Sequence, residues 1–180
     1  MRKESYLETA QREFRRLKGL ADGALAQIDE RELLVTLGSG EVSAAILMKH
    51  LAGNMLSRWL DFLTTDGEKP HRNRDSEFAV TLADTRPRLT ERWERGWGCL
   101  FTALEELREE EMSREVLIRG EPHTVLQAIQ RQLTHYAYHT GEIVLIAKCL
   151  AGPRWKTLSV PKGESRVFNE APQPYLTEDT

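Results

Sequence analysis

The sequence predicts an all-α protein, an antiparallel four-helix bundle with a short β-hairpin or extended crossing before the last helix and an irregular C-terminal tail. Two observations carry this prediction. Apolar residues recur every three or four positions in four separate segments, which is the period of an amphipathic helix. Polar stretches with glycine and proline, which end helices, stand between these segments. Because no internal repeat or linker occurs, we expect residues 1–180 to form one domain, with a tail from about residue 153.

The first two helices are expected over about Ser5 to Ile28 and Ser43 to Thr64. In the first, apolar side chains at helical steps alternate with charged ones: Tyr6, Ala10, Phe14, Leu17, Ala21, Ala24 and Ile28. Gly-Ser-Gly at 38–40 then breaks the chain. The second helix has apolar residues on most sides, which predicts deep burial.

A polar excursion is expected over 66–78, DGEKPHRNRDSEF, because it contains Gly67 and Pro70 and has no apolar period. Pro87 then fits the entry of a third helix. This helix is expected to end in an acidic run near Glu111, where negative charge opposes the helix dipole and favours fraying.

Residues 116–125, VLIRGEPHTV, contain two β-prone runs, which fit either a small hairpin or an extended crossing. Thr124 is suited to cap the last helix, which is expected to stop at Gly152. The tail has aromatic anchors at Trp155 and Phe168, so its first half is expected to pack on the bundle. Its last ten residues are expected to be mobile.

Composition excludes several classes of protein. The 25 basic and 28 acidic residues give a net charge of -3, which argues against nucleic-acid binding. No stretch approaches the roughly 18 apolar residues of a membrane span, and the basic N-terminus lacks the apolar core of a leader. Cys99 and Cys149 have no CxxC spacing and suit buried thiols in a reducing compartment. We therefore expect a cytoplasmic protein with no nucleic-acid or membrane partner.

Three histidines form a candidate metal site. His135 and His139 stand four residues apart on the last predicted helix, so their imidazoles project from one side and can share a cation. An isolated pair of this kind is more often two surface histidines. His50, however, also lies in an apolar helical stretch, and three buried imidazoles become inexpensive to bury when all bind one ion. We therefore predict a site formed by all three.

Other polar residues accompany this candidate site. Asn54 and Glu142 lie one turn after their histidines and can orient an imidazole or serve as further ligands, although ordinary helix-surface positions explain them equally well. Arg72 and Arg74 can bind a carboxylate of a substrate, against the alternative of a solvated loop. Tyr136 can donate a hydrogen bond into the site, against the alternative of core packing.

Three neutral imidazoles leave coordination positions open, which is typical of a catalytic site rather than a closed structural one. Zinc, nickel, iron or manganese ions suit such ligands. An open cation lowers the pKa of a bound thiol or water and so generates a nucleophile. The sequence contains no Walker loop, GxGxxG motif or Ser-His-Asp grouping, and it identifies no catalytic residue.

The segments KHLAGNMLSRWLDFLTTDGEKPHRNRDSEF, THYAYHTGEIVLIAKCL and WKTLSVPKGESRVFN resemble the DUF1572 branch of the DinB-like superfamily over about Ser43 to Asn169. The HxxxH motif is loose, whereas the DGEKPxRNRDxEF and WKTLSxPxGxSxxFN strings are specific to that branch. By this resemblance, His50, His135 and His139 correspond to the metal ligands of a four-helix bundle. The resemblance also implies a bacterial protein that forms a homodimer.

Better understood DinB-like proteins include bacillithiol- or mycothiol-dependent enzymes, among them S-transferases and an isomerase. The resemblance therefore suggests a metal-dependent transferase that activates a low-molecular-weight thiol for attack on an electrophile. The alternative is a non-catalytic stress protein that binds a metal or a small ligand. Both alternatives share the three-histidine site.

Overall fold

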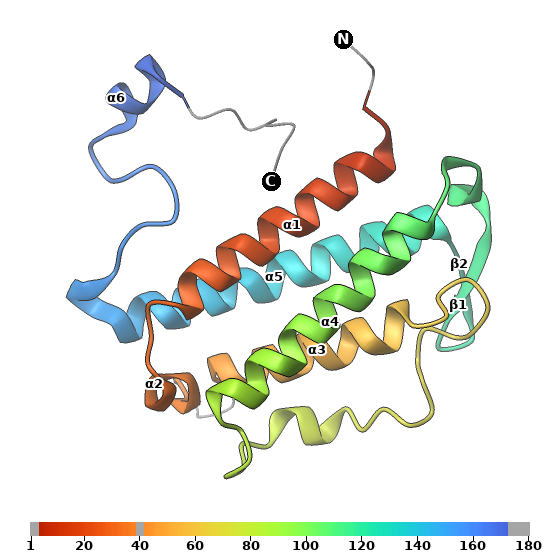
Figure 1. The fold of residues 1–180 in the computed structure, drawn as a ribbon, viewed down its shortest axis with the longest axis horizontal. Helices are drawn as coiled ribbons and strands as arrows, with labels where there is room; N and C mark the ends of the chain where they lie inside the picture. Colours follow the sequence, from red (N-terminus) through yellow and green to blue (C-terminus); the bar gives the residue numbers. More distant parts are fainter. Residues whose placement is uncertain (1–3, 39–41, 173–180) are drawn as a thin grey trace.

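The computed structural model describes residues 4–38 and 42–172. Four long helices lie side by side in an antiparallel bundle (Figure 1): α1 (Tyr6–Leu25), α3 (Ala44–Trp59), α4 (Arg86–Glu106) and α5 (Val125–Ala151). Helix α1 packs mainly against α5, and α3 mainly against α4. The predicted all-α bundle is confirmed. Within the described ranges, no helix is both long and apolar enough to cross a membrane.

One aromatic ring from each long helix meets in the core. The Phe14 ring of α1 lies 6.1 Å from Trp59 of α3 and 5.8 Å from Tyr136 of α5, centroid to centroid. Trp97 of α4 lies 5.9 Å from Tyr136. All four side chains are buried, and each removes roughly 150–250 Å² from water. This cluster fixes α5 relative to α3 beside the histidines.

Helix starts follow their capping residues. Ser5 and Glu8 form a capping box at α1, and the Ser43 hydroxyl accepts from Ile46 N–H at α3. Thr124 caps α5 through Gln127, as predicted, so that the first backbone N–H groups are satisfied.

Two helix ends differ from the prediction. Helix α1 ends at Leu25 rather than Ile28, and a further helix, α2 (Glu30–Leu34), follows behind an Asp29 cap. Helix α3 ends at Trp59 rather than Thr64, because the chain turns at Asp61, whose φ is +48°. Phe62 is buried beyond this turn, so the apolar run outlasts the helix.

The third helix also ends earlier than predicted. Helix α4 stops at Glu106, and the extended Leu107 enters the core. The acidic run forms a separate 3₁₀ turn, η2 (Glu109–Ser113), which removes most of its negative charge from the carbonyl end of α4.

The segment before α5 is a hairpin, which settles the two alternatives. Strands β1 (Glu115–Ile118) and β2 (Glu121–Thr124) pair antiparallel, with Ile118 opposite Glu121. Arg119 and Gly120 both have positive φ, as the tight turn requires. The Asp66 carboxylate accepts from both of their N–H groups, at 2.8 and 2.6 Å.

The 66–78 segment is irregular, as predicted, except for the 3₁₀ turn η1 (Asp75–Phe78), which lies against α3. Two buried cations of α3 hold this segment and the residues that follow it up to Asp84. Lys49 pairs with Asp84 at 2.9 Å, and Arg58 pairs with Glu68 at 3.1 Å.

The tail after α5 begins with the turn η3 (Gly152–Arg154) and includes α6 (Ser165–Glu170). Trp155 packs against the core as predicted. Phe168 is only half-buried, and the segment that carries α6 lies away from the bundle in Figure 1, so Phe168 does not act as the expected anchor. The last ten residues were predicted to be mobile. From residue 173 onward they lie outside the described residues.

Cys149 is exposed on α5, so the prediction that this thiol is buried is wrong. Leu145, one turn earlier on the same face of α5, is also exposed. Cys99 is half-buried and packs against the core, so it agrees better than Cys149 with the predicted burial.

Candidate metal centre

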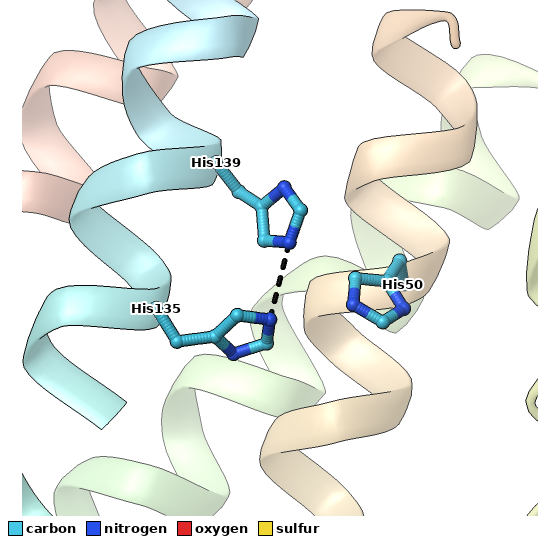
Figure 2. Close-up of side chains that lie close together, drawn as sticks. All are labelled: His50, His135 and His139. Carbon is cyan, nitrogen blue, oxygen red and sulfur yellow. Dashed lines mark hydrogen bonds between the residues drawn. The ribbon is translucent and has the colours of Figure 1, made fainter. Parts of the chain in front are cut away.

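The two histidines of α5 lie one turn apart and face each other. The Nε2 atoms of His135 and His139 are 3.1 Å apart (Figure 2). Two imidazoles that bind one zinc ion at about 2.0–2.1 Å, with an angle between 90° and tetrahedral, place their nitrogens about 2.8–3.4 Å apart. The observed spacing therefore fits two ligands of one ion.

His50 completes the group from α3. Its ring centroid lies 5.5 Å from that of His135 and 5.0 Å from that of His139. One ligand atom from each histidine lies within 4.8 Å of the other two, and Figure 2 shows the rings converging between the helices. The structure thus brings together the three histidines that the sequence singled out.

Two of the rings are held by carboxylates. His50 Nδ1 lies 3.0 Å from Glu77 Oε2, and His139 Nδ1 lies 2.7 Å from Glu142 Oε2. Because an ionised carboxylate only accepts hydrogen bonds, each Nδ1 is the donor, which leaves Nε2 as the ring atom that can bind a metal. Glu142 thus orients His139, as the sequence suggested.

Glu77 is the partner that the sequence analysis did not identify. Its carboxylate is fully buried and also accepts from Arg72 Nε and Nη2, each at 2.9 Å. Burial alone would raise the pKa of Glu77, but the hydrogen bonds from His50 and Arg72 outweigh it and the pKa is lowered. Glu77 is therefore anionic beside His50.

A glycine makes room for this carboxylate. A Cβ atom added to Gly53, on α3, would overlap Oε1 of Glu77. The absence of a side chain at Gly53 thus lets Glu77 lie directly on the helix, one turn from His50.

The α5 imidazoles are neutral at physiological pH. Burial, with the rings of His139 and His50 and the charge of Arg58, lowers the pKa of His135 to about 3. Burial also lowers the pKa of His139, although Glu142 partly opposes the shift. Neutral imidazole is the form that binds metals.

Asn54 and Tyr136 form a hydrogen-bonded chain behind the site. The buried Tyr136 hydroxyl donates to Asn54 Oδ1 at 3.0 Å and accepts from Trp59 Nε1 at 3.1 Å. Asn54 is therefore hydrogen-bonded to a core tyrosine, and among the described residues no hydrogen bond joins it to a histidine ring. Tyr136 lies in the core rather than in the wall of the cleft described next.

An open cleft of about 470 Å³ adjoins the histidines. Arg72 and Arg74, predicted as substrate ligands, both line it, but Arg72 is engaged by Glu77. The other lining residues are His50, Asn54, Arg58, Arg119, Arg131, Gln132, Thr134, His135 and Tyr138. A cleft of this volume suits a small molecule.

The donor set fits a divalent metal ion. Three imidazoles converge, two are oriented by buried or half-buried carboxylates, and the cleft reaches two of the three ligands. A closed structural site would need a fourth protein ligand, and the described residues add none to this histidine group. The arrangement can therefore hold an ion that keeps at least one coordination position free for a small molecule in the cleft.

Comparisons place this fold among known proteins. The sequence model of a family described as "Protein of unknown function (DUF1572)" matches residues 2–164. No curated protein matches the chain. A structure titled "Crystal structure of the conserved protein of locus from Enterococcus faecalis" is similar, with a TM-score of 0.62 and 16% identity, covering 83% of this chain and 99% of that chain. At this identity the likeness concerns the fold alone.

Proposed function

We propose that this chain, which belongs to the DUF1572 family, binds a divalent metal ion through His50, His135 and His139 and acts as a thiol S-transferase. The convergence of three imidazoles beside an open cleft is the observation that carries the proposal. The resemblance to DinB-like proteins with thiol-dependent activities supports it further.

A divalent cation at this site would lower the pKa of a coordinating thiol and so supply thiolate at neutral pH. In the proposed reaction the thiol sulfur forms a bond to an electrophilic carbon. The leaving group departs with the bonding electron pair, and the thiol proton passes to solvent. Thiol and electrophile thus become a thioether, a proton and the released anion.

The chain's own residues fit this chemistry. The arginines of the cleft favour the anionic form of a thiol that enters it. Neither Cys99 nor Cys149 lines the cleft, so the sulfur nucleophile would come from the ligand. A cytoplasmic location in a bacterium, where low-molecular-weight thiols stay reduced, suits this role.

Metal content tests the first part of the proposal. Protein purified without a histidine tag should contain about one equivalent of a divalent metal by elemental analysis, and His135→Ala should lose it. His71→Ala, which removes an exposed histidine outside the site, is the matched control and should retain the metal. Unmutated protein without stoichiometric metal would refute the site.

Turnover tests the second part. Incubation with monochlorobimane and a panel of small thiols should give a faster thioether-forming rate with the unmutated protein than with His135→Ala. Equal rates, with metal still bound by the unmutated protein, would exclude the transferase and support the non-catalytic metal-binding alternative.

A further inference from the structure

Arginine dominates the charged lining of the cleft beside the histidines. Five arginines line it and no acidic residue does: Arg58, Arg72, Arg74, Arg119 and Arg131. They come from α3, from the 66–78 segment, from the turn of the hairpin and from α5, so separate parts of the fold bring positive charge to one opening.

Three of these arginines are already paired with acids behind the cleft. Arg58 and Arg72 are nearly buried and bind Glu68 and Glu77. Arg119 Nε donates to the same Glu68 at 3.0 Å. Their charge is therefore largely compensated within the protein.

Arg74 and Arg131 keep binding capacity. No carboxylate of the described residues lies within ion-pair distance of Arg74, whose guanidinium instead lies 4.8 Å above the Phe78 ring. Arg131 Nη1 is 3.0 Å from His123 Nε2. Its distance to the exposed Glu121 carboxylate is 3.9 Å, which is long for an ion pair. An exposed pair at that distance is weak and screened by salt, so an anionic ligand can compete with Glu121.

The spacing along α5 links this charge to the candidate metal site. Arg131 precedes His135 by four residues, so both side chains project from the same side of the helix, one turn apart. Between them, the buried Gln132 also lines the cleft, and its Oε1 has no hydrogen-bond partner in the described parts of the chain. A ligand that spans one helical turn, about 5.4 Å, would reach from Arg131 to the histidines.

We infer that the cleft binds a small thiol that carries a carboxylate or phosphate group, which Arg74 and Arg131 hold while the sulfur end faces His50, His135 and His139. This inference rests on the proposed function and specifies its substrate class. The guanidinium fork matches the oxygen geometry of both anions. Arg72, which the sequence suggested for this role, is instead committed to Glu77.

Three thiols of equal length test the inference. Binding of 3-mercaptopropionate, 3-mercaptopropanol and 3-aminopropanethiol to the cobalt(II)-loaded protein is followed by thiolate-to-cobalt absorption. The anionic thiol should bind about tenfold or more tightly than the neutral one, and the cationic thiol most weakly. The double variant Arg74→Gln/Arg131→Gln should lose this order and keep its cobalt. Arg166→Gln, an exposed arginine of α6, is the control. Equal affinities in the unmutated protein would overturn the inference and leave the metal site intact.

Titration of the metal-free protein with succinate and with inorganic phosphate, followed by calorimetry, separates the two anions. The stronger binder identifies the class, and binding should disappear in the double variant. This titration needs no metal, so it tests the inference even if cobalt fails to bind. Failure to bind cobalt would refute the proposed function alone. Absence of binding by both anions, or binding that survives in the double variant, would overturn the inference.

Discussion

Glu77 Oε2 lies 3.0 Å from His50 Nδ1, although neither periodicity nor sequence spacing connects the two residues. The contact joins an irregular segment to a core helix. Because Arg72 donates to both oxygens of the carboxylate, Glu77 is fixed in position as well as charged. The 66–78 segment therefore contributes to the candidate metal site from outside the bundle helices.

Replacement of this carboxylate should weaken metal binding. Glu77→Gln removes the anion that orients His50, and the affinity for zinc should fall by about 10–100-fold. Asp75→Asn, an exposed acid of the same turn, should leave the affinity unchanged. Competition with a chromophoric chelator measures both. Unaltered affinity in Glu77→Gln would mean that the His50 contact has no role in the site.

The space at Gly53 gives an independent test of the same contact. In Gly53→Ala the new methyl group would displace the Glu77 carboxylate, so zinc affinity should fall in the same direction as in Glu77→Gln. Gly141→Ala on α5, where an added Cβ meets no atom within 4 Å, should gain up to about 1 kcal/mol of stability and keep its affinity. A Gly53→Ala protein with full affinity would argue against this positioning.

The stability of the metal-free protein should depend on the protonation of His135. Its pKa is about 3 in the folded protein and near the ordinary 6.5 when unfolded, so between these values only the unfolded chain takes up the proton. This difference in proton uptake lowers the free energy of unfolding. The loss is absent well above pH 6.5 and grows as the pH falls toward 3. Discounted for the partial exposure of the ring, it amounts to about 1 kcal/mol at pH 5.

His135→Leu lacks this loss of stability. Between pH 7.5 and pH 5, measured with a chelator present, its urea midpoint should fall less than that of the unmutated protein. The exposed His71, replaced by leucine, should leave the pH dependence as it is. Parallel curves for His135→Leu and the unmutated protein would contradict the shifted pKa.

The hydroxyl of Tyr136 should matter for stability and not for metal binding. Tyr136→Phe leaves the buried Asn54 and Trp59 groups without their partner, which should cost about 1–2 kcal/mol of unfolding free energy. The exposed Tyr138, replaced by phenylalanine, should show no measurable change in stability. Chemical denaturation and elemental analysis distinguish the two roles, because loss of metal from Tyr136→Phe would place its hydroxyl in the site.

Helical periodicity predicted the four long helices because each buries one apolar face over many turns. The histidines could be found in the same way, since i, i+4 spacing places His135 beside His139 and His50 is a polar ring in an apolar helix. Helix ends were less predictable. The buried Phe62 continues the apolar pattern of α3 after the backbone has turned at Asp61.

Glu77 could not be predicted from periodicity, because the 66–78 segment has no apolar period and its partner His50 lies far away in the sequence, on α3. Its presence in the DGEKPxRNRDxEF string was the available signal, and the role required the fold. Arg131 was overlooked for a different reason. In the sequence, Arg131 is typical of a charged residue on a helix surface. Only the fold shows that the hairpin and the 66–78 segment line the same cleft.

The three histidines join α3 to α5, which pack less closely with each other than α3 does with α4 or α5 with α1. Nearly half of the chain separates the two helices. A bound ion would thus act as a removable cross-link between them. By mass action, free metal at a hundredfold excess over its dissociation constant would add about 2.7 kcal/mol to the unfolding free energy. The thermal resistance of the protein, and its survival against proteolysis, would then follow the metal supply of its surroundings.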